Sequence, residues 1–278
     1  MELKEKINKV LESYYEAYPI TFDEKKHQYR INGEIAAGVS SVSDYAPKEW
    51  MKAWAVKLVV EHIKNNCEKE YYPVPAGEKP SLYYYKVSED ELAEAKNAPN
   101  KRSKDALDVG TRTHDWIENH IKGVKLPITD DIRNPVEEFL KFEKKHAVEW
   151  IISEKIVCWR EHKVAGRVDA LALVDGVLSL VDLKTSKQID EGYFLQTAGY
   201  QASLESMGVE GIKQRVILRL PKTQGDQFEA VRVNTDYELD KQAFLNRRYS
   251  WQWNNYVDSQ FKERVGGSKY KTLKLDKI

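Results

Sequence analysis

The segment Val164–Lys184 constrains the fold of this chain more than any other part. It reads VAGRVDALALVDGVLSLVDLK, two apolar runs separated by Asp175-Gly176. Asp-Gly between two such runs is a strong signal for a two-residue β-hairpin turn, so we expect strands at Val164–Val174 and Val177–Leu183. Successive positions in both runs are apolar, so both faces of the sheet must be covered. The segment therefore predicts a sheet that lies between helices.

The remaining elements follow from periodicity and turn signals. Helices are expected over residues 1–18, 47–66, 103–122, 134–148 and 191–207, and from about 236 to 261. Further strands are expected at Ile151–Trp159, Arg215–Leu220 and Phe228–Val233, and short ones within residues 20–35 around Asn32-Gly33. A glycine pair at 266–267 and a basic tail end the sequence. The fold class is thus α/β, with a mixed, mostly antiparallel sheet flanked by helices and a mainly helical N-terminal region over residues 1–102.

Two aromatic segments each have two interpretations. Residues 67–101 are rich in tyrosine and proline and look like an insertion or lid with one short helix around Glu89–Ala98. Within it, Tyr83–Tyr85 next to Lys86 would either stack on the bases of a single strand or pack on the body of the protein. The basic and aromatic residues of Arg247–Trp253 would either line a DNA groove or pack the C-terminal helix.

Composition sets limits on location and partners. Lys plus Arg and Asp plus Glu number 44 each, so the net charge neither supports nucleic-acid binding nor excludes a local basic groove. The two cysteines, Cys67 and Cys158, are too few for a four-cysteine iron–sulfur cluster, so we expect no such cluster and two free thiols. The start of the sequence lacks the apolar run of a signal peptide, and no stretch has the length of a membrane helix. We therefore expect a cytoplasmic protein with no membrane partner.

The chemistry of the chain is concentrated at the end of the predicted hairpin. Asp182 and Lys184 are two apart on one strand and therefore project to the same side. Asp169 on the neighbouring strand can lie beside Asp182, and two adjacent carboxylates repel each other unless a cation lies between them. Oxygen ligands with room for water suit Mg²⁺ or Mn²⁺. Such an ion would polarise a phosphoryl oxygen and lower the pKa of a bound water. Lys184 would orient or deprotonate that water, or stabilise the charged transition state.

A simpler interpretation exists for each part of this pattern. An isolated Asp-x-Lys at a strand end is usually a solvated surface ion pair. The full arrangement of Gly166-x-x-Asp169, hairpin, apolar strand and Asp-x-Lys is much rarer and favours a metal site. Gly166 fits this arrangement, because the absence of a side chain leaves room for a close approach of backbone or substrate.

The segment AGRVDALALVDGVLSLVDLKTSK resembles the core of the PD-(D/E)XK nucleases, a restriction-endonuclease-like α/β core, and specifically the RecB-type exonuclease branch. The resemblance extends over about residues 103–205, and the segment Val39–Trp54 is more weakly similar to the N-terminal part of some members. Further matching features are Gly-x-x-x-His at Gly110 and His114, a glutamate at Glu154, Thr185-Ser186 after the lysine, and Gln-x-x-x-Tyr at Gln196 and Tyr200.

This resemblance implies a role for each matching residue. His114, Asp169, Asp182 and the carbonyl of Leu183 would bind the metal, and Lys184 would be the catalytic lysine. Gln196 and Tyr200 would position DNA or support the site. Glu154 would support the ligands or assist a second metal. The family often has Glu where this chain has Asp182, which shortens the reach to the ion. Without the resemblance, His114 fits a core histidine, and Gln196 and Tyr200 fit ordinary packing residues on one helix face.

The implied function is that of a Mg²⁺- or Mn²⁺-dependent DNA exonuclease. It would hydrolyse phosphodiester bonds at DNA ends or in single strands, in recombination, repair or phage DNA processing. We expect a single nuclease domain over 1–278, with its core at 103–235 and a C-terminal helix and tail at 236–278. The alternatives are an endonuclease on the same core and a non-catalytic DNA-binding relative.

Overall fold

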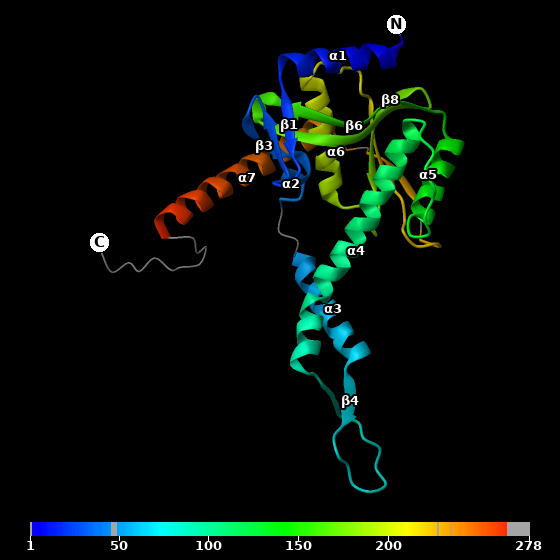
Figure 1. Ribbon diagram of the computed structural model, residues 1–278, viewed down its shortest axis with the longest axis vertical. Helices are drawn as coiled ribbons and strands as arrows, with labels where there is room; N and C mark the ends of the chain where they lie inside the picture. The colour runs from blue at the N-terminus through cyan, green and yellow to red at the C-terminus, as the bar shows by residue number, and fades with distance from the viewer. Residues whose placement is uncertain (1, 46–48, 227, 234, 266–278) are drawn as a thin grey trace. The chain divides into compact units, whose positions relative to one another are not determined.

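A computed structural model describes residues 2–45, 49–226, 228–233 and 235–265 (Figure 1). The chain forms two compact units, one comprising Met1–Ala46 and Thr113–Ile278 and the other comprising Pro47–Arg112. These limits differ from the expected single domain with an insertion at 67–101. The second unit begins some twenty residues earlier and takes in the helix that precedes the tyrosine-rich segment.

The first unit is built on an eight-stranded sheet in the order β1-β2-β3-β7-β8-β9-β10, with β6 paired to β7. The strands are β1 (Ile20–Asp23), β2 (Gln28–Ile31), β3 (Glu34–Gly38), β6 (Val148–Trp159), β7 (Val164–Val174), β8 (Val177–Lys184), β9 (Gln214–Arg219) and β10 (Glu229–Arg232). The β3–β7 and β8–β9 pairs are parallel and the other pairs are antiparallel. The predicted fold class, a mixed and mostly antiparallel sheet, is confirmed.

Both predicted hairpin turns are present. Asn32 and Gly33 have φ of 50° and 80°, and Asp175 and Gly176 have φ of 51° and 80°. Positive φ at both central residues is the type I′ geometry that suits the twist of two-residue hairpins. The second turn fixes the register of β7 against β8, and through it the position of Asp169 relative to Asp182.

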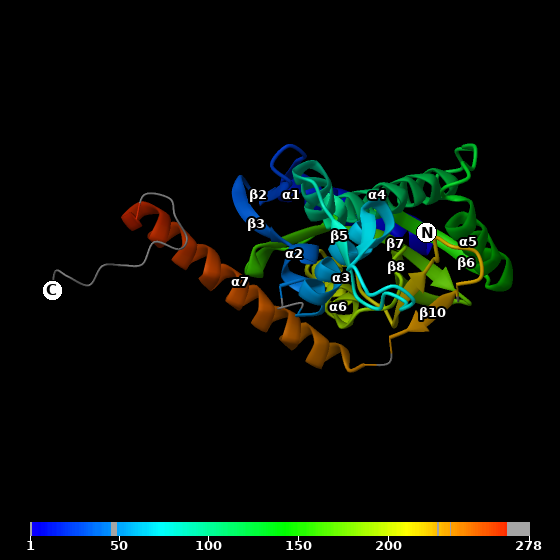
Figure 2. The same cartoon turned by 90° about the horizontal axis from the view of Figure 1, so that it is seen from below.

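Helices cover both faces of this sheet. They are α1 (Leu3–Ala17), α2 (Val39–Ser43), α5 (Arg133–Lys145), α6 (Glu191–Ser206) and α7 (Tyr237–Val265). The main core joins Leu11 of α1, Leu171 of β7, Leu204 of α6 and Phe244 of α7. Helix α5 lies on the other side of the sheet, as Figure 2 shows, where Phe139 stacks on Trp150 at 5.7 Å between ring centroids. Six consecutive residues of β8, Leu178–Leu183, are buried, which confirms that both faces are covered.

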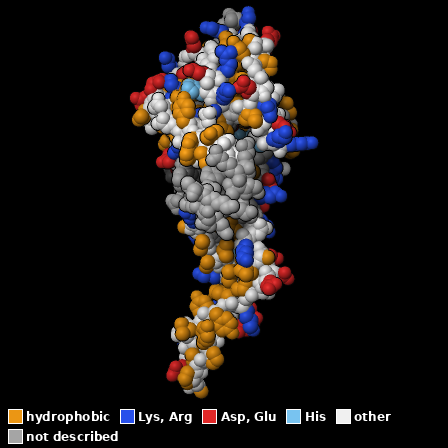
Figure 3. All heavy atoms as spheres, turned by 90° about the vertical axis from the view of Figure 1, so that its left-hand side faces the viewer, with side chains coloured by type: hydrophobic (Ala, Val, Ile, Leu, Met, Phe, Trp, Pro, Cys, Tyr) orange, Lys and Arg blue, Asp and Glu red, His pale blue; other side chains and the backbone are white. Residues whose placement is uncertain are grey.

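The second unit contains α3 (Glu49–Asn66), a hairpin of β4 (Glu68–Tyr71) and β5 (Tyr83–Lys86), and the first part of α4 (Glu89–Ile121). The prediction of separate helices at 89–98 and 103–122 is wrong, because α4 runs without a break through Pro99. The hairpin was not anticipated. Its tyrosines contact one another, Tyr71 with Tyr83 and Tyr72 with Tyr84. Hydrophobic side chains gather around it in Figure 3.

Helix α7 contains the second aromatic segment, Arg247–Trp253, and two of its residues have partners within the protein. Arg247 donates to the carbonyl of Ser43, and Arg248 donates to that of His162. Both arginines therefore serve packing, while Trp253 stays exposed. The predicted glycine break and basic tail lie outside the described residues. Among the helices that the structure describes, none combines the length and the apolar character needed to span a membrane.

Candidate active site

The site forms where β7 lacks a neighbour along one edge. Strand β6 pairs with β7 along its whole length, so β3 and β8 share the opposite edge. Strand β8 pairs with β7 as far as Ala170, and β3 pairs with it only at Val164 and Ala165. The interval of β7 between these pairings, residues 166–169, is open on that edge. The pattern Gly166-x-x-Asp169 spans this interval.

Asp169 and Asp182 come together at the end of the β7–β8 ladder. Each is the next residue beyond the last pair, Ala170 with Val181. Opposite residues of an antiparallel pair project to the same face, so both carboxylates face the same side. Beyond the ladder, the backbone N–H of Leu183 donates to Oδ2 of Asp169 at 2.6 Å. A strand residue directs its N–H and C=O to the same edge, so the Leu183 carbonyl also faces the interval beside Asp169.

Glu154 extends the pair into a row of three carboxylates. The pairs Ser153–Ala170 and Lys155–Val168 flank it, which places Glu154 opposite Asp169. Its φ of 51° lies in the left-handed region, where a glutamate is strained. Strained backbone of this kind tends to cluster at functional sites.

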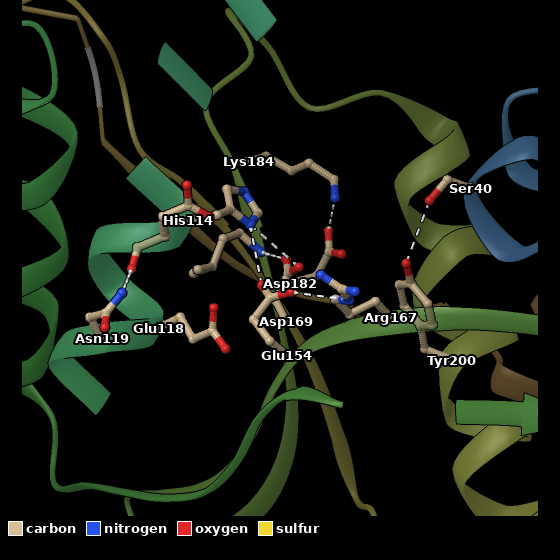
Figure 4. Close-up of polar contacts among 12 residues, drawn as sticks. Ser40, His114, Glu118, Asn119, Glu154, Arg167, Asp169, Asp182, Lys184 and Tyr200 are labelled. Carbon is tan, nitrogen blue, oxygen red and sulfur yellow. Dashed lines mark hydrogen bonds and ion pairs between the residues drawn. The ribbon is translucent and has the colours of Figure 1, made fainter. Parts of the chain in front are cut away.

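His114 of α4 completes a group of potential metal ligands. Its Nδ1 lies 3.5 Å from Oδ1 of Asp169 and 3.8 Å from Oε1 of Glu154 (Figure 4). One ligand atom from each of these three residues lies within 4.8 Å of the others. Burial disfavours the imidazolium, but the charge of Asp169 and the hydrogen bonds to Asp169 and Glu154 outweigh it and raise the pKa of His114 to about 10.

Lys184 and Asp182 form a largely buried ion pair in the site. Nζ of Lys184 lies 2.6 Å from Oδ2 of Asp182, and the exposed fractions of the two side chains are 15% and 2%. Burial lowers the pKa of Lys184, but the negative charges of Asp182 and Asp169 raise it above its usual value. Nζ also lies 4.9 Å from the centroid of the Tyr193 ring, a cation–π contact.

The two aspartates differ in their environments. Burial raises the pKa of Asp182 to about 6, against the lowering effect of Lys184. Neither carboxylate oxygen of Asp182 accepts a well-directed hydrogen bond from the residues that the structure describes. Burial also acts on Asp169, but the charges of His114 and Lys184 and the Leu183 N–H hold its pKa below the usual value. Burial raises the pKa of Glu154.

Gln196 and Tyr200 lie at the edge of this group. The amide of Gln196 donates to Oγ of Ser40 at 3.1 Å and to the hydroxyl of Tyr200 at 3.3 Å. The Tyr200 ring fills the space left by Gly166, where an added Cβ would lie 2.8 Å from Cε1 of the ring and 3.0 Å from Cβ of Val39. We expected backbone or substrate to approach Gly166 closely, but side chains of α6 and α2 occupy this space instead. Burial raises the pKa of Tyr200, and the negative charges of Asp169 and Asp182 add to this.

Three residues near the site were not singled out from the sequence. Ser40 follows the strand β3 on the short helix α2, in the segment Val39–Trp54, whose weaker resemblance to the family singled out no residue. Tyr193 is one of many tyrosines, and nothing in the sequence distinguishes it. Arg167 could have been found, because it precedes Asp169 by two residues on the same strand and must share its face.

The donors at this site fit a hard divalent cation. Asp169 and Glu154 offer carboxylate oxygens and His114 offers an imidazole nitrogen within 4.8 Å of one another. Asp182 is not part of that close group, but its carboxylate lies next to Asp169 in the strand register and its buried oxygens lack directed donors. A cation close to Asp182 would compensate the burial of its charge. Carboxylate oxygen suits both Mg²⁺ and Mn²⁺. Of these two ions, Mn²⁺ accepts an imidazole ligand more readily than Mg²⁺ does.

Comparison with known proteins gives distant likenesses only. No protein-family model and no curated protein matches the chain. Among solved structures, a protein from Eubacterium rectale for which an exonuclease function has been suggested is 14% identical, with a TM-score of 0.34. That match covers 52% of this chain and 68% of that one. An alkaline exonuclease from Laribacter hongkongensis is 11% identical, with a TM-score of 0.30. Its match covers 83% of this chain and 95% of that one. Likenesses this low assign neither a family nor an activity to the chain.

Proposed function

We propose that this protein is a metal-dependent DNA nuclease of the PD-(D/E)XK superfamily and its RecB-type branch, acting as an exonuclease on ends or single strands. One observation carries the proposal. Asp169, Asp182 and Lys184 converge at the open edge of β7, with His114 and Glu154 beside them. Recombination, repair and phage DNA processing are the processes that such an activity would serve.

The residues divide into metal ligands and their neighbours. His114, Asp169 and Asp182, with the Leu183 carbonyl, would hold Mg²⁺ or Mn²⁺, and Glu154 would support these ligands or a second ion. When bound, the ion polarises a phosphoryl oxygen and lowers the pKa of a coordinated water. Gln196 donates hydrogen bonds to Ser40 and Tyr200 at the edge of the site. Gln196 and Tyr200 would support the site and position the DNA strand there.

Lys184 supplies a fixed positive charge next to the ligands. Asp182 and Asp169 raise its pKa, so Lys184 is protonated at neutral pH. A protonated lysine stabilises negative charge that develops on the phosphoryl group, and donates hydrogen bonds that orient the attacking water.

The proposal is tested by digestion of end-labelled linear DNA, single- and double-stranded, with Mg²⁺ or Mn²⁺. Closed circular DNA is the third substrate. We expect release of nucleotides from linear DNA and no cleavage of circles. Lys184→Ala should lower turnover by about 10²–10³-fold, as loss of a donor that stabilises transition-state charge does. Lys141→Ala, which removes an exposed lysine paired with Glu138 on α5, serves as the matched control and should retain full activity.

Two other outcomes would change the assignment. Cleavage of closed circles would favour the endonuclease alternative. A wild-type protein that binds DNA but cleaves none of the substrates with either metal would favour the non-catalytic alternative.

A further inference from the structure

Arg167 lies at the solvent-facing side of the site. It precedes Asp169 by two residues on β7 and therefore projects to the same face. Figure 4 shows its guanidinium beside the carboxylate of Glu154. Its side chain is 43% exposed, whereas that of Asp169 is 12% exposed. A ligand that enters the site from solvent would reach Arg167 before it reaches the aspartates.

The hydrogen-bonding capacity of this guanidinium is unused. The shortest ion-pair distance of Arg167 joins its Nε to Oε2 of Glu154 at 3.9 Å, which is too long for a hydrogen bond. Within the described part of the chain, Arg167 makes no hydrogen bond through its guanidinium. Arg215 and Arg219, by contrast, are buried and donate to a carboxylate and a backbone carbonyl each. Arg167 therefore has donors to offer to a ligand.

An aromatic pair from the β1–β2 hairpin supports Arg167. Its Cζ lies 5.8 Å from the centroid of the Phe22 ring, and Phe22 contacts Tyr29 at 4.5 Å between centroids. Contact with a ring face restrains the guanidinium plane and leaves its N–H edge exposed. Burial raises the pKa of Tyr29, and the charge of Arg167 lowers it, which is consistent with their proximity.

The chemistry of the site determines which ligand fits this edge. A guanidinium cannot coordinate a cation, so Arg167 is not a metal ligand. Its weak and exposed contact with Glu154 contributes little to neutralising the acidic row. A planar fork of donors matches the oxygens of a phosphate group. The row of carboxylates would otherwise repel a DNA strand.

We infer that Arg167 binds a phosphate of the substrate strand, the one adjacent to the phosphate at the metal ligands. This inference rests on the proposed nuclease function and adds a strand-anchoring subsite to it. Arg167 would thus fix which phosphodiester bond lies at the ligands. Phe22 would act through the guanidinium as a positioning residue.

The inference is tested by equilibrium binding of a single-stranded oligonucleotide in the Lys184→Ala background with Mn²⁺, which slows hydrolysis. Adding Arg167→Ala should weaken binding about 10–100-fold, the value of a charge-assisted hydrogen-bonded contact. The slope of log K against log salt should fall by about 0.7, the value for one phosphate contact on a single strand. Arg167→Lys should restore part of the affinity, because it keeps the charge without the fork.

Two controls separate this role from general damage. Arg160→Ala removes another exposed arginine that lies over a tyrosine ring, that of Tyr18 at 4.0 Å, and should leave binding unchanged. The Mn²⁺ affinity of Arg167→Ala without DNA should equal that of the parent protein. Loss of metal binding in this variant would assign Arg167 to the acidic row and overturn the inference.

A neutral methylphosphonate identifies the phosphate. The methylphosphonate replaces the phosphate on one side of the cleaved phosphodiester. At the position that Arg167 contacts, it should weaken binding by the Lys184→Ala parent protein. It should have no further effect on the variant that also carries Arg167→Ala. Equal losses in both proteins would overturn the inference. An active wild-type enzyme whose Arg167→Ala variant binds DNA normally contradicts this subsite alone. A wild-type protein that hydrolyses no DNA contradicts the proposed function.

Discussion

Nζ of Lys184 lies 2.6 Å from Oδ2 of Asp182, and both side chains are largely buried. Next to this pair, Asp169 and Glu154 face His114. Without a bound cation, the cluster holds three carboxylates against one ammonium and one imidazolium. Both aspartates are proposed metal ligands, but in the metal-free protein the pKa of Asp182 is raised and that of Asp169 is lowered. Their negative charges therefore have opposite effects on the stability of the metal-free protein.

Asp182→Asn should stabilise the metal-free protein at pH 8, and Asp169→Asn should destabilise it. The raised pKa of Asp182, about 6, means that its ionisation costs folding free energy as the pH rises through this value. The lowered pKa of Asp169 means that its charge stabilises the fold above its usual pKa, and this contribution is lost as the pH falls through the lowered value. We expect the melting temperature to rise in Asp182→Asn and to fall in Asp169→Asn. The shift should be about 2–4 °C for each kcal/mol of change in the free energy of unfolding.

The same two variants should both lose the rise in melting temperature that Mn²⁺ gives to the wild type. Shifts of the same sign for both variants in metal-free buffer at pH 8 would contradict the assignment of charges in this cluster.

Metal binding at pH 8 should release about one proton per ion. His114 has a pKa of about 10 in the metal-free site, so its imidazole is protonated there and must become neutral to bind a metal. Calorimetric titrations with Mn²⁺ in two buffers of different ionisation enthalpy measure this proton release. His114→Gln should abolish it. An equal proton release from the variant would exclude His114 as the source.

Metal affinity should also rise with pH between about 5 and 7. Asp182 binds a proton below its pKa of about 6, and this proton competes with the cation. In Asp182→Asn, the residual Mn²⁺ affinity should rise less steeply with pH over this interval, because only the proton of His114 is then displaced.

Gly166→Ala should lower stability by about 1–3 kcal/mol, because the new methyl group overlaps the Tyr200 ring and Val39. Tyr200→Ala empties the same space and lowers the stability of the protein by removing a buried ring. In the double variant the methyl group overlaps only Val39, so the combined loss should be smaller than the sum of the single losses. Urea denaturation of the four proteins gives the coupling. Strict additivity would show that the ring does not occupy the space beside Gly166.

Pro99→Ala should stabilise the second unit. Pro99 lies inside α4, where it has no N–H to donate to the preceding turn and its ring disfavours the helical backbone. Alanine restores the hydrogen bond, with an expected gain of about 1–3 kcal/mol. Ala98→Gly, at the neighbouring position, is the control and should destabilise the same helix by about 1 kcal/mol. A loss of stability in Pro99→Ala would contradict a continuous helix at this point.

The sequence by itself determined the centre of the sheet. The apolar runs of β7 and β8 and the Asp175-Gly176 turn are local signals, and a two-residue turn leaves only one register for its strands. The spacing of Asp169, Asp182 and Lys184 relative to that turn then places their side chains on one face. The element types along β1–β3, α5, α6 and β9 also followed from local periodicity.

Tertiary structure decided what surrounds these residues. Local rules predict a break at Pro99, but α4 continues through it. The hairpin β4–β5 depends on pairing between segments separated by a proline-rich loop, which no local pattern specifies. The open edge of β7 arises because β3 and β8, far apart in the sequence, share one side of that strand and stop short of each other. Ser40, Tyr193 and the support of Arg167 by Phe22 come from such long-range contacts. Local sequence thus set which side chains face together, and the packing of distant segments set their burial, partners and charge.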